Sequence, residues 1–271
     1  MGDDLGADLD IYRRLAGARL RAELQYRASF ALQTVGNFLV QLAELAALLI
    51  LFRHVETLGG WTAGEVAFLY GLSGLSFGIA HTLASGFSAF SQLIVRGGFD
   101  RLLVRPVGAM LQVLAEDIQL RRLGQAIQGG AALVVAARLV DVEWTAGRAL
   151  YLPIVLLSAT LLFAALFALE ATLCFWTTEA TEIINAFTYG GSDVAQYPLH
   201  IFDTGLRRFF LFVVPVGFVV YAPALYLLDK PDPLGLPTFT RFVAPAAALL
   251  FACLAGAAWH LGVRHYRSTG T

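Results

Sequence analysis

Four polar side chains recur along one apolar segment near the beginning of the chain. Gln33, Asn37, Gln41 and Glu44 follow one another at spacings of 4, 4 and 3 residues, which places them on one face of a helix. A charged side chain near the centre of a bilayer costs roughly 2.5–3.5 kcal/mol on insertion scales, so this face should point at protein or water. Two interpretations stay open: a wall of a translocation cavity, with Glu44 favouring a cationic or hydrogen-bonding solute, or a polar seam between helices.

The next apolar segment carries a second polar set at helical spacing, made of His81, Ser85, Ser88 and Gln92. Three glycines precede this set and would let another helix approach closely, namely Gly71, Gly74 and Gly78. Helix packing explains the set as a whole better than chemistry does. His81 is the member that we expect to line the translocation pathway, although a hydrogen-bonded helix residue is the simpler interpretation.

Aromatic side chains and prolines are combined in a later apolar segment, residues 208–228. Pro215 and Pro223 each remove a backbone hydrogen bond and can kink a helix. Phe212, Phe218 and Tyr221 would then form a gate or an apolar contact for a substrate. Ordinary aromatic side chains facing lipid are the alternative.

Catalytic motifs are absent from the sequence. The single lysine is Lys230, so there is no Gly-x-x-x-x-Gly-Lys-[Ser/Thr] phosphate loop, and no nucleophile elbow, His-Glu-x-x-His pair or dinucleotide fingerprint occurs. The other histidines are not spaced from His81 as the ligands of a metal site would be. We therefore expect no enzymatic activity of its own, no bound metal and no cofactor in this chain.

The elements that would position these residues are membrane-spanning helices. The chain is 58% hydrophobic and only 14% charged, and its apolar segments reach the roughly 20 residues that cross a hydrocarbon core as a helix. This predicts an all-α polytopic membrane protein whose transmembrane domain, residues 28–263, has six spans. The expected spans are 28–52, 63–93, 111–137, 149–176, 208–228 and 241–263.

The distribution of positive charge predicts the orientation. Of the 19 Lys and Arg residues, 14 fall on one side when the six segments are threaded in order. They include Arg207, the last residue of an inner connection at 177–207, and Arg208 at the start of the fifth span. Cationic loops stay cytoplasmic, so both termini are expected inside. The 18 arginines against one lysine suggest a GC-rich bacterial genome, and the expected location is a bacterial inner membrane, crossed several times.

The ends of the chain are expected to be cytoplasmic tails, residues 1–27 and 264–271. Within the first tail, apolar positions recur at helical spacing from Leu9 to Leu24, with arginines off that face. An amphipathic interfacial helix on anionic lipid headgroups fits this pattern, and a simple topology signal fits it equally.

The inner loop 94–110 is short, combines apolar with charged residues, and has glycines near its start and a proline near its end. It contains Gly97, Phe99, Asp100, Arg101, Leu102, Leu103, Arg105 and Pro106. Such an element, apolar on one side and charged on the other, suits docking into a groove of a soluble partner. A loop kept inside by its arginines alone is the alternative.

This loop resembles that of six-span permease subunits of ABC-2 type exporters. Gly97, Asp100, Leu102, Leu103, Arg105 and Pro106 match the family pattern Gly-x-x-Asp-x-Leu-Leu-x-Arg-Pro. A second stretch is also similar, through Tyr197-Pro198-Leu199, Pro215 and Tyr221-Ala222-Pro223. The topological resemblance covers nearly the whole chain.

The resemblance implies a permease of an ATP-driven exporter that pairs with a second permease, identical or a sister subunit. Two ATPase subunits on separate chains would carry ATP and Mg, and the loop from Phe99 to Arg105 would be the coupling helix. Lipids and proteins, but no nucleic acid, are the expected partners. Spans one, two and five would flank the cavity. Two alternatives remain: a proton-coupled secondary transporter that uses Glu44 or His81, and a membrane-embedded enzyme.

Overall fold

The computed structural model describes Gly17 and residues 27–105, 107–117, 119, 122–177 and 181–266. Over these residues the chain is built from helices and contains no β-strand, which confirms the predicted all-α class. Apart from Gly17, the predicted amphipathic helix at residues 9–24 lies outside the described residues, as does Pro106 of the inner loop.

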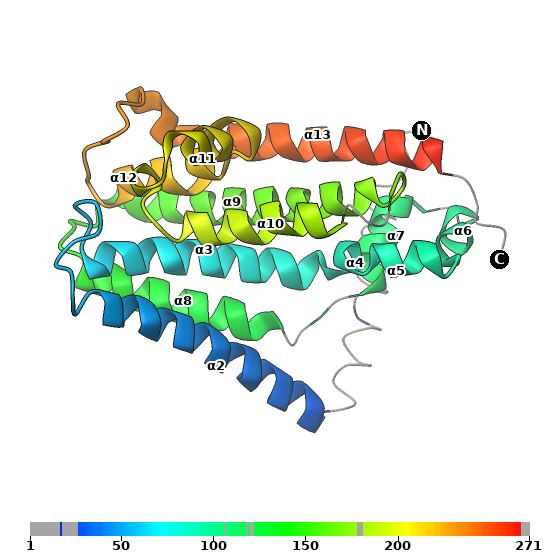
Figure 1. Cartoon of the computed structure of the whole chain (residues 1–271), viewed down its shortest axis with the longest axis horizontal. Helices are drawn as coiled ribbons and strands as arrows, with labels where there is room; N and C mark the ends of the chain where they lie inside the picture. The colour runs from blue at the N-terminus through cyan, green and yellow to red at the C-terminus, as the bar shows by residue number, and fades with distance from the viewer. Residues whose placement is uncertain are drawn as a thin grey trace.

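Six helices run lengthwise through an elongated bundle (Figure 1). They are α2 (Arg27–Leu51), α3 (Ala63–Leu83), α8 (Leu123–Leu139), α9 (Ala146–Leu173), α10 (Thr181–Ala195) and α13 (Ala244–His265). Four short helices cluster at one end, which we term the α6 end: α4 (Ser85–Ser88), α5 (Phe90–Val95), α6 (Gly98–Leu103) and α7 (Ala109–Glu116). The opposite end, where α3 begins beside Trp61, is the Trp61 end. The start of α2 and the end of α13 both lie toward the α6 end.

The remaining short elements lie between α10 and α13. They are the 3-10 turn η2 (Leu199–Ile201), α11 (Thr204–Arg208), the π-helical turns η3 (Phe209–Val213) and η4 (Gly217–Tyr221), α12 (Ala222–Leu227) and the 3-10 turn η5 (Thr238–Phe242).

Four described helices are long and apolar enough to cross a membrane: Ala31–Leu51 within α2, and α3, α9 and α13. Two predicted spans are therefore shorter than expected. The span predicted at 63–93 ends at Leu83, where α4 and α5 take over. The span predicted at 111–137 is divided into α7 and the 17-residue α8, with extended backbone at Asp117.

The fifth predicted span, 208–228, is not one helix. The segments Thr204–Val213 and Gly217–Leu227 meet at an angle of 80°. Pro215 lacks an N–H and forces the preceding residue away from helical geometry, and Val214 accordingly has φ −113° and ψ 93°. Near the two ends of this segment, His200 Nε2 lies 2.7 Å from the Gly59 carbonyl and Lys230 Nζ donates to the Gly60 carbonyl at 2.9 Å. The bent pair therefore leaves and returns at the Trp61 end.

Helix α10 takes the place that the sequence analysis assigned to an inner, interfacial connection. It runs antiparallel to α3, because the Tyr189 hydroxyl meets His81 Nε2 at 3.2 Å and Ser73 Oγ donates to the Ser192 carbonyl at 3.0 Å. Residues 181–195 therefore form a helix alongside α3 where an inner connection was expected, and Arg207 and Arg208 lie beyond this helix, on the side of the Trp61 end. Moving these two residues changes the division of positive charges from 14 against 5 to 12 against 7, so the bias keeps its sign.

Close helix contact through glycine, predicted for the second apolar segment, is confirmed. A Cβ at Gly71 would fall on backbone atoms of Leu133, and one at Gly78 would fall on those of Ala126. Small residues let α3 and α8 approach until their backbones touch, which is how helices associate without a hydrophobic driving force.

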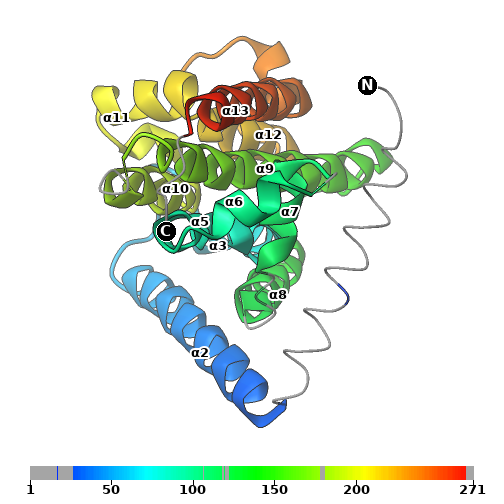
Figure 2. The same cartoon turned by 90° about the vertical axis from the view of Figure 1, so that its right-hand side faces the viewer.

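Helix α2 stands apart along one flank of the bundle, diverging from it toward its own N-terminal end (Figure 2). Leu48 is its only buried residue among those whose side chains the structure describes. The polar face of α2 is therefore held beside the bundle without being packed into it.

Candidate substrate cavity and inner docking surface

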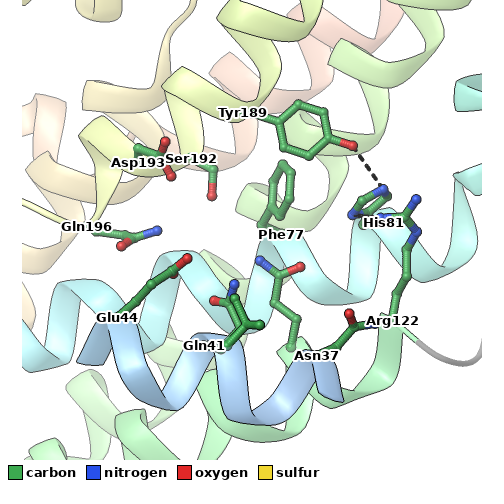
Figure 3. A pocket seen from close by; sticks show the side chains of 12 residues that line it. Asn37, Gln41, Glu44, Phe77, His81, Arg122, Tyr189, Ser192, Asp193 and Gln196 are labelled. Atoms are coloured by element: carbon green, nitrogen blue, oxygen red, sulfur yellow. Dashed lines mark hydrogen bonds between the residues drawn. The ribbon is translucent and has the colours of Figure 1, made fainter. Parts of the chain in front are cut away.

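A polar cavity of about 350 Å³ lies between α2, α3, α8 and α10. Three of the four residues on the predicted polar face of α2 line it, and so does His81 (Figure 3). This face of α2 thus borders a cavity, and its part in translocation stays a prediction. The full lining consists of Asn37, Val40, Gln41, Glu44, Phe77, His81, Arg122, Gln125, Tyr189, Ser192, Asp193 and Gln196. Gln33 lies at a neighbouring hollow beside Asn37 and Arg122.

The end of the cavity nearer the Trp61 end is acidic. Glu44 of α2 and Asp193 of α10 face one another across it (Figure 3), near enough to interact electrostatically. Ser192 of α10 and Gln196, which follows the helix, add a hydroxyl and an amide, and both residues are buried. This end therefore presents oxygen acceptors from two helices.

The other end contains a connected set of His81, Arg122 and Tyr189. Arg122 approaches His81 Nδ1 at 3.2 Å, while the opposite ring nitrogen, Nε2, lies 3.2 Å from the Tyr189 hydroxyl. A guanidinium only donates, so Nδ1 accepts and the proton of a neutral imidazole belongs on Nε2, facing Tyr189. Both ring nitrogens are thus engaged, and His81 is held rigidly between α8 and α10.

The three aromatic residues predicted for the pathway lie elsewhere. Phe212 and Phe218, 5.7 Å apart between ring centroids, line an apolar groove against α13. Tyr221 is buried, with its ring 5.9 Å from Trp61 and its hydroxyl 3.1 Å from His200 Nδ1. None of the three lines the polar cavity, because the bent pair carries them to other surfaces.

Sequence analysis missed the α10 wall of the cavity. Tyr189, Ser192, Asp193 and Gln196 have spacings of 3, 1 and 3, which is the pattern of one helical face. The signal was present in the sequence, but the segment had been assigned to the inner interface. Arg122 and Gln125 were missed for a related reason, since the predicted third span ran through them as one helix.

A second candidate surface is α6, the predicted coupling loop. Gly97 begins it in the left-handed conformation (φ 64°), which favours glycine. Phe99 and Leu102 are buried, and the Phe99 ring lies 5.4 Å from Phe175 and 5.0 Å from Tyr266. These two loop residues therefore anchor α6 to α9 and to the end of α13, and they are not available to a partner.

The outward side of the same loop is both apolar and charged. Val104 is 84% exposed and Leu103 41% exposed, and both arginines flanking this pair, Arg101 and Arg105, are exposed. Helix α7 holds the loop in place, because Gln112 Nε2 donates to the carbonyls of Leu102 (3.0 Å) and Val107 (2.8 Å).

Asp100 lies between the anchored and the exposed sides of α6. Burial, together with the neighbouring Asp100 carboxylate, raises the pKa of the Tyr266 hydroxyl, which follows the last residue of α13. Asp100 is thus placed beside the C-terminal end of α13, next to the aromatic anchor.

No group of three or more His, Cys, Asp or Glu side chains that could hold a metal ion is found in the described part of the chain. The cavity lining offers carboxylate, amide, hydroxyl, imidazole and guanidinium groups to a bound solute.

Comparison with known proteins gives one family. No curated protein and no solved structure matches the chain. The family model for ABC-2 family transporter proteins matches residues 38–270, which include every helix of the bundle except the first part of α2. The chain therefore belongs to the ABC-2 family of transporter proteins, and it is a multi-pass membrane permease of an ABC transporter.

Proposed function

We propose that this chain is the permease subunit of an ATP-driven exporter in a bacterial inner membrane. It would cross the membrane with the six lengthwise helices α2, α3, α8, α9, α10 and α13, with both termini and the α6 end in the cytoplasm. The bent pair between α10 and α13 would enter the membrane from the outer face and return to it. Counted along the sequence, 12 of the 19 Lys and Arg residues fall on the side of the two termini, and this bias supports the orientation.

The observation that carries the proposal is the exposed side of α6. Val104 and Leu103 form an apolar pair at the tip of the bundle, flanked by Arg101 and Arg105. Apolar side chains with a charged rim are typical of a surface that docks a partner. In an ABC transporter that partner is the ATPase, which would bind ATP and Mg on its own chain.

Anchoring explains how α6 would transmit motion. Phe99 packs against Phe90 of α5, with ring centroids 5.2 Å apart, and against Phe175, which follows α9. Because dense aromatic packing deforms little, a shift of α6 would move the inner ends of α9 and α13 with it. Closure of the ATPase pair could thus tilt the permease between inward- and outward-facing states.

A second permease, identical or a sister subunit, would complete the cavity. Glu44 and Asp193 are exposed on the open side of the cavity in a single chain, at a depth where a charged group facing lipid is costly. Covering by another permease would remove this exposure and enclose the translocation pathway between the two subunits.

Co-purification of the ATPase tests the proposal. The full-length permease is extracted in mild detergent with its native partners, and ATP-binding subunits are identified by mass spectrometry. Leu103→Asp combined with Val104→Asp should abolish recovery of the ATPase while leaving membrane insertion intact. The matched control is Val55→Asp, a charge added at an exposed valine of the opposite end.

Equal recovery of the ATPase with the double variant, the control and the wild type would overturn the docking assignment. Transport that continues without any ATPase and stops when the proton gradient is collapsed would instead establish the proton-coupled alternative.

A further inference from the structure

We infer that the acidic end of the cavity binds an organic cation through its N–H groups, with Glu44, Asp193, Gln196 and Ser192 as the acceptors. The inference rests on the proposed permease function, because it names the chemical class of solute that the same cavity would carry. Ammonium, amidinium and guanidinium groups all have the required charge and donors.

The two carboxylates at the acidic end carry negative charge that no described cation compensates. Glu44 and Asp193 face each other across the cavity, and neither forms an ion pair within the part of the chain that the structure describes. Two carboxylates that share one site repel each other, and a cation between them converts this repulsion into two attractions.

Arg122 does not neutralise this pair. It lies beside Tyr189, and Asp193 follows Tyr189 by four positions along α10. At 1.5 Å per residue this separation is roughly 6 Å along the helix. Arg122 also donates to Gln119 Oε1 at 2.7 Å and approaches His81 at 3.2 Å, so part of its donor capacity is already used.

Two further polar side chains turn their hydrogen-bonding groups toward the acidic end of the cavity. Gln196 is 8% exposed and Ser192 3% exposed, and both side chains line the cavity. Figure 3 shows the Gln196 amide pointing toward the Glu44 side of the cavity. Neither side chain has a hydrogen bond to another described residue, so both keep their hydrogen-bonding groups available to whatever occupies the cavity. A ligand with several N–H donors would bind to the Gln196 carbonyl oxygen and the Ser192 hydroxyl.

The shape of the site favours an organic body over a metal ion. Phe77 and Tyr189, with ring centroids 5.4 Å apart, form an aromatic wall along a cavity of about 350 Å³. Among the described residues, no cluster has the three His, Cys, Asp or Glu side chains of a metal site. A cation attached to a planar or apolar group would meet the carboxylates and the aromatic wall together.

The test uses three probes of nearly equal shape and different charge: benzamidinium, neutral benzamide and anionic benzoate. The full-length permease is placed in nanodiscs of phosphatidylglycerol, which has no cationic headgroup, and binding is followed by saturation-transfer NMR and calorimetry. We expect benzamidinium to bind, and benzamide and benzoate to bind at least tenfold more weakly. Equal binding of the three probes would overturn the inference.

Variants assign the binding to the acidic end. Glu44→Gln and Asp193→Asn should each weaken benzamidinium roughly tenfold or more, the loss expected for a hydrogen bond to a charged group. Gln196→Ala should weaken it without changing the preference for charge. Glu56→Gln, which removes a carboxylate outside the cavity, is the matched control. Unchanged affinity in Glu44→Gln and Asp193→Asn, with folding confirmed by thermal unfolding, would refute the assignment.

A lipid amine and a soluble cation share the same chemistry, and a second arm separates them. Loss of benzamidinium binding after phosphatidylethanolamine is added would identify the lipid headgroup as an occupant, whereas unchanged binding would point to soluble cations. Probe binding needs no ATPase. If the permease co-purified with its ATPase but did not bind benzamidinium, this inference alone would be refuted. If it bound benzamidinium but recovered no ATPase, only the proposed coupling would be refuted.

Discussion

At the scale of single residues, the inner loop divides into anchors and contacts. Phe99 and Leu102 point into the bundle, while Leu103 and Val104 point away from it. The sequence identifies the loop as a unit but does not distinguish these sides, because Leu102 and Leu103 are chemically identical neighbours. Only the packing of Phe99 against Phe175 and Tyr266 fixes which of them is buried.

Removal of the anchor should destabilise the protein. Phe99→Ala deletes a fully buried ring from an aromatic cluster and leaves a cavity, at a cost of about 3 kcal/mol. Thermal unfolding in detergent should show a clearly lower midpoint for this variant. Val104→Ala, a change at an 84% exposed position, is the control and should stay within about 0.5 kcal/mol of the wild type. Equal midpoints for the two variants would contradict the anchoring role.

The residues of the cavity were predicted unevenly for a physical reason. The polar face of α2 is visible in the sequence because Asn37, Gln41 and Glu44 interrupt an otherwise apolar segment. The matching face of α10 follows Thr181, Glu182 and Asn185, in a stretch polar enough to resemble a connection between helices. The average hydropathy of this stretch is too low to predict a lengthwise helix, because one side of the helix is polar and lines the cavity.

At the scale of elements, the contact between α3 and α8 depends on glycine at defined positions. The backbones touch at Gly71 and Gly78, whereas a Cβ at Gly74 would meet Gly129 Cα only at 3.6 Å, an ordinary contact. The sequence predicted that these glycines admit another helix, and the identity of that helix required the structure.

These positions provide a matched pair of substitutions. Gly71→Ala should cost about 1–3 kcal/mol, because the new methyl group falls on the Leu133 backbone and forces the helices apart. Gly74→Ala should be nearly neutral. Equilibrium unfolding in mixed micelles measures both variants, and equal stabilities would show that α3 and α8 do not approach as closely as described.

The bent pair shows the limit of hydropathy as a guide to topology. Residues 208–228 are apolar and long enough to span, so sequence alone predicts a crossing. Hydropathy measures how hydrophobic a segment is, but it does not show whether the segment crosses the membrane or returns to the side from which it entered. The contacts of His200 with Gly59 and of Lys230 with Gly60, each joining residues more than 140 positions apart, determine the return.

At the scale of the whole molecule, the bent pair and α10 exchange roles relative to the prediction. Among the described helices, the fifth that runs lengthwise is α10, and residues 204–227 leave from the Trp61 end and return to it. The start of α2 and the end of α13 both lie toward the α6 end, so this exchange does not bear on the proposed orientation.

Cysteine labelling distinguishes the two topologies. In a background of Cys174→Ser and Cys253→Ser, a Thr204→Cys variant should react with a membrane-impermeant maleimide added outside intact cells. Arg101→Cys should react only after permeabilisation, and Asp232→Cys, which is external in both topologies, is the positive control. If the cysteine at position 204 reacted with the maleimide only after permeabilisation, residues 177–207 would lie on the inner side, as the sequence predicts.

The central claim, that an ATPase docks on the exposed side of α6, is tested most directly by site-specific photocrosslinking. A benzophenone amino acid is introduced in cells at Val104, at Phe99 or at Asp232. The account predicts a crosslink from position 104 to a protein that mass spectrometry identifies as an ATPase with a phosphate loop, and none from the opposite end at 232. Position 99 should give at most crosslinks within the permease. No ATPase crosslink at 104, together with one at 232, would contradict the account.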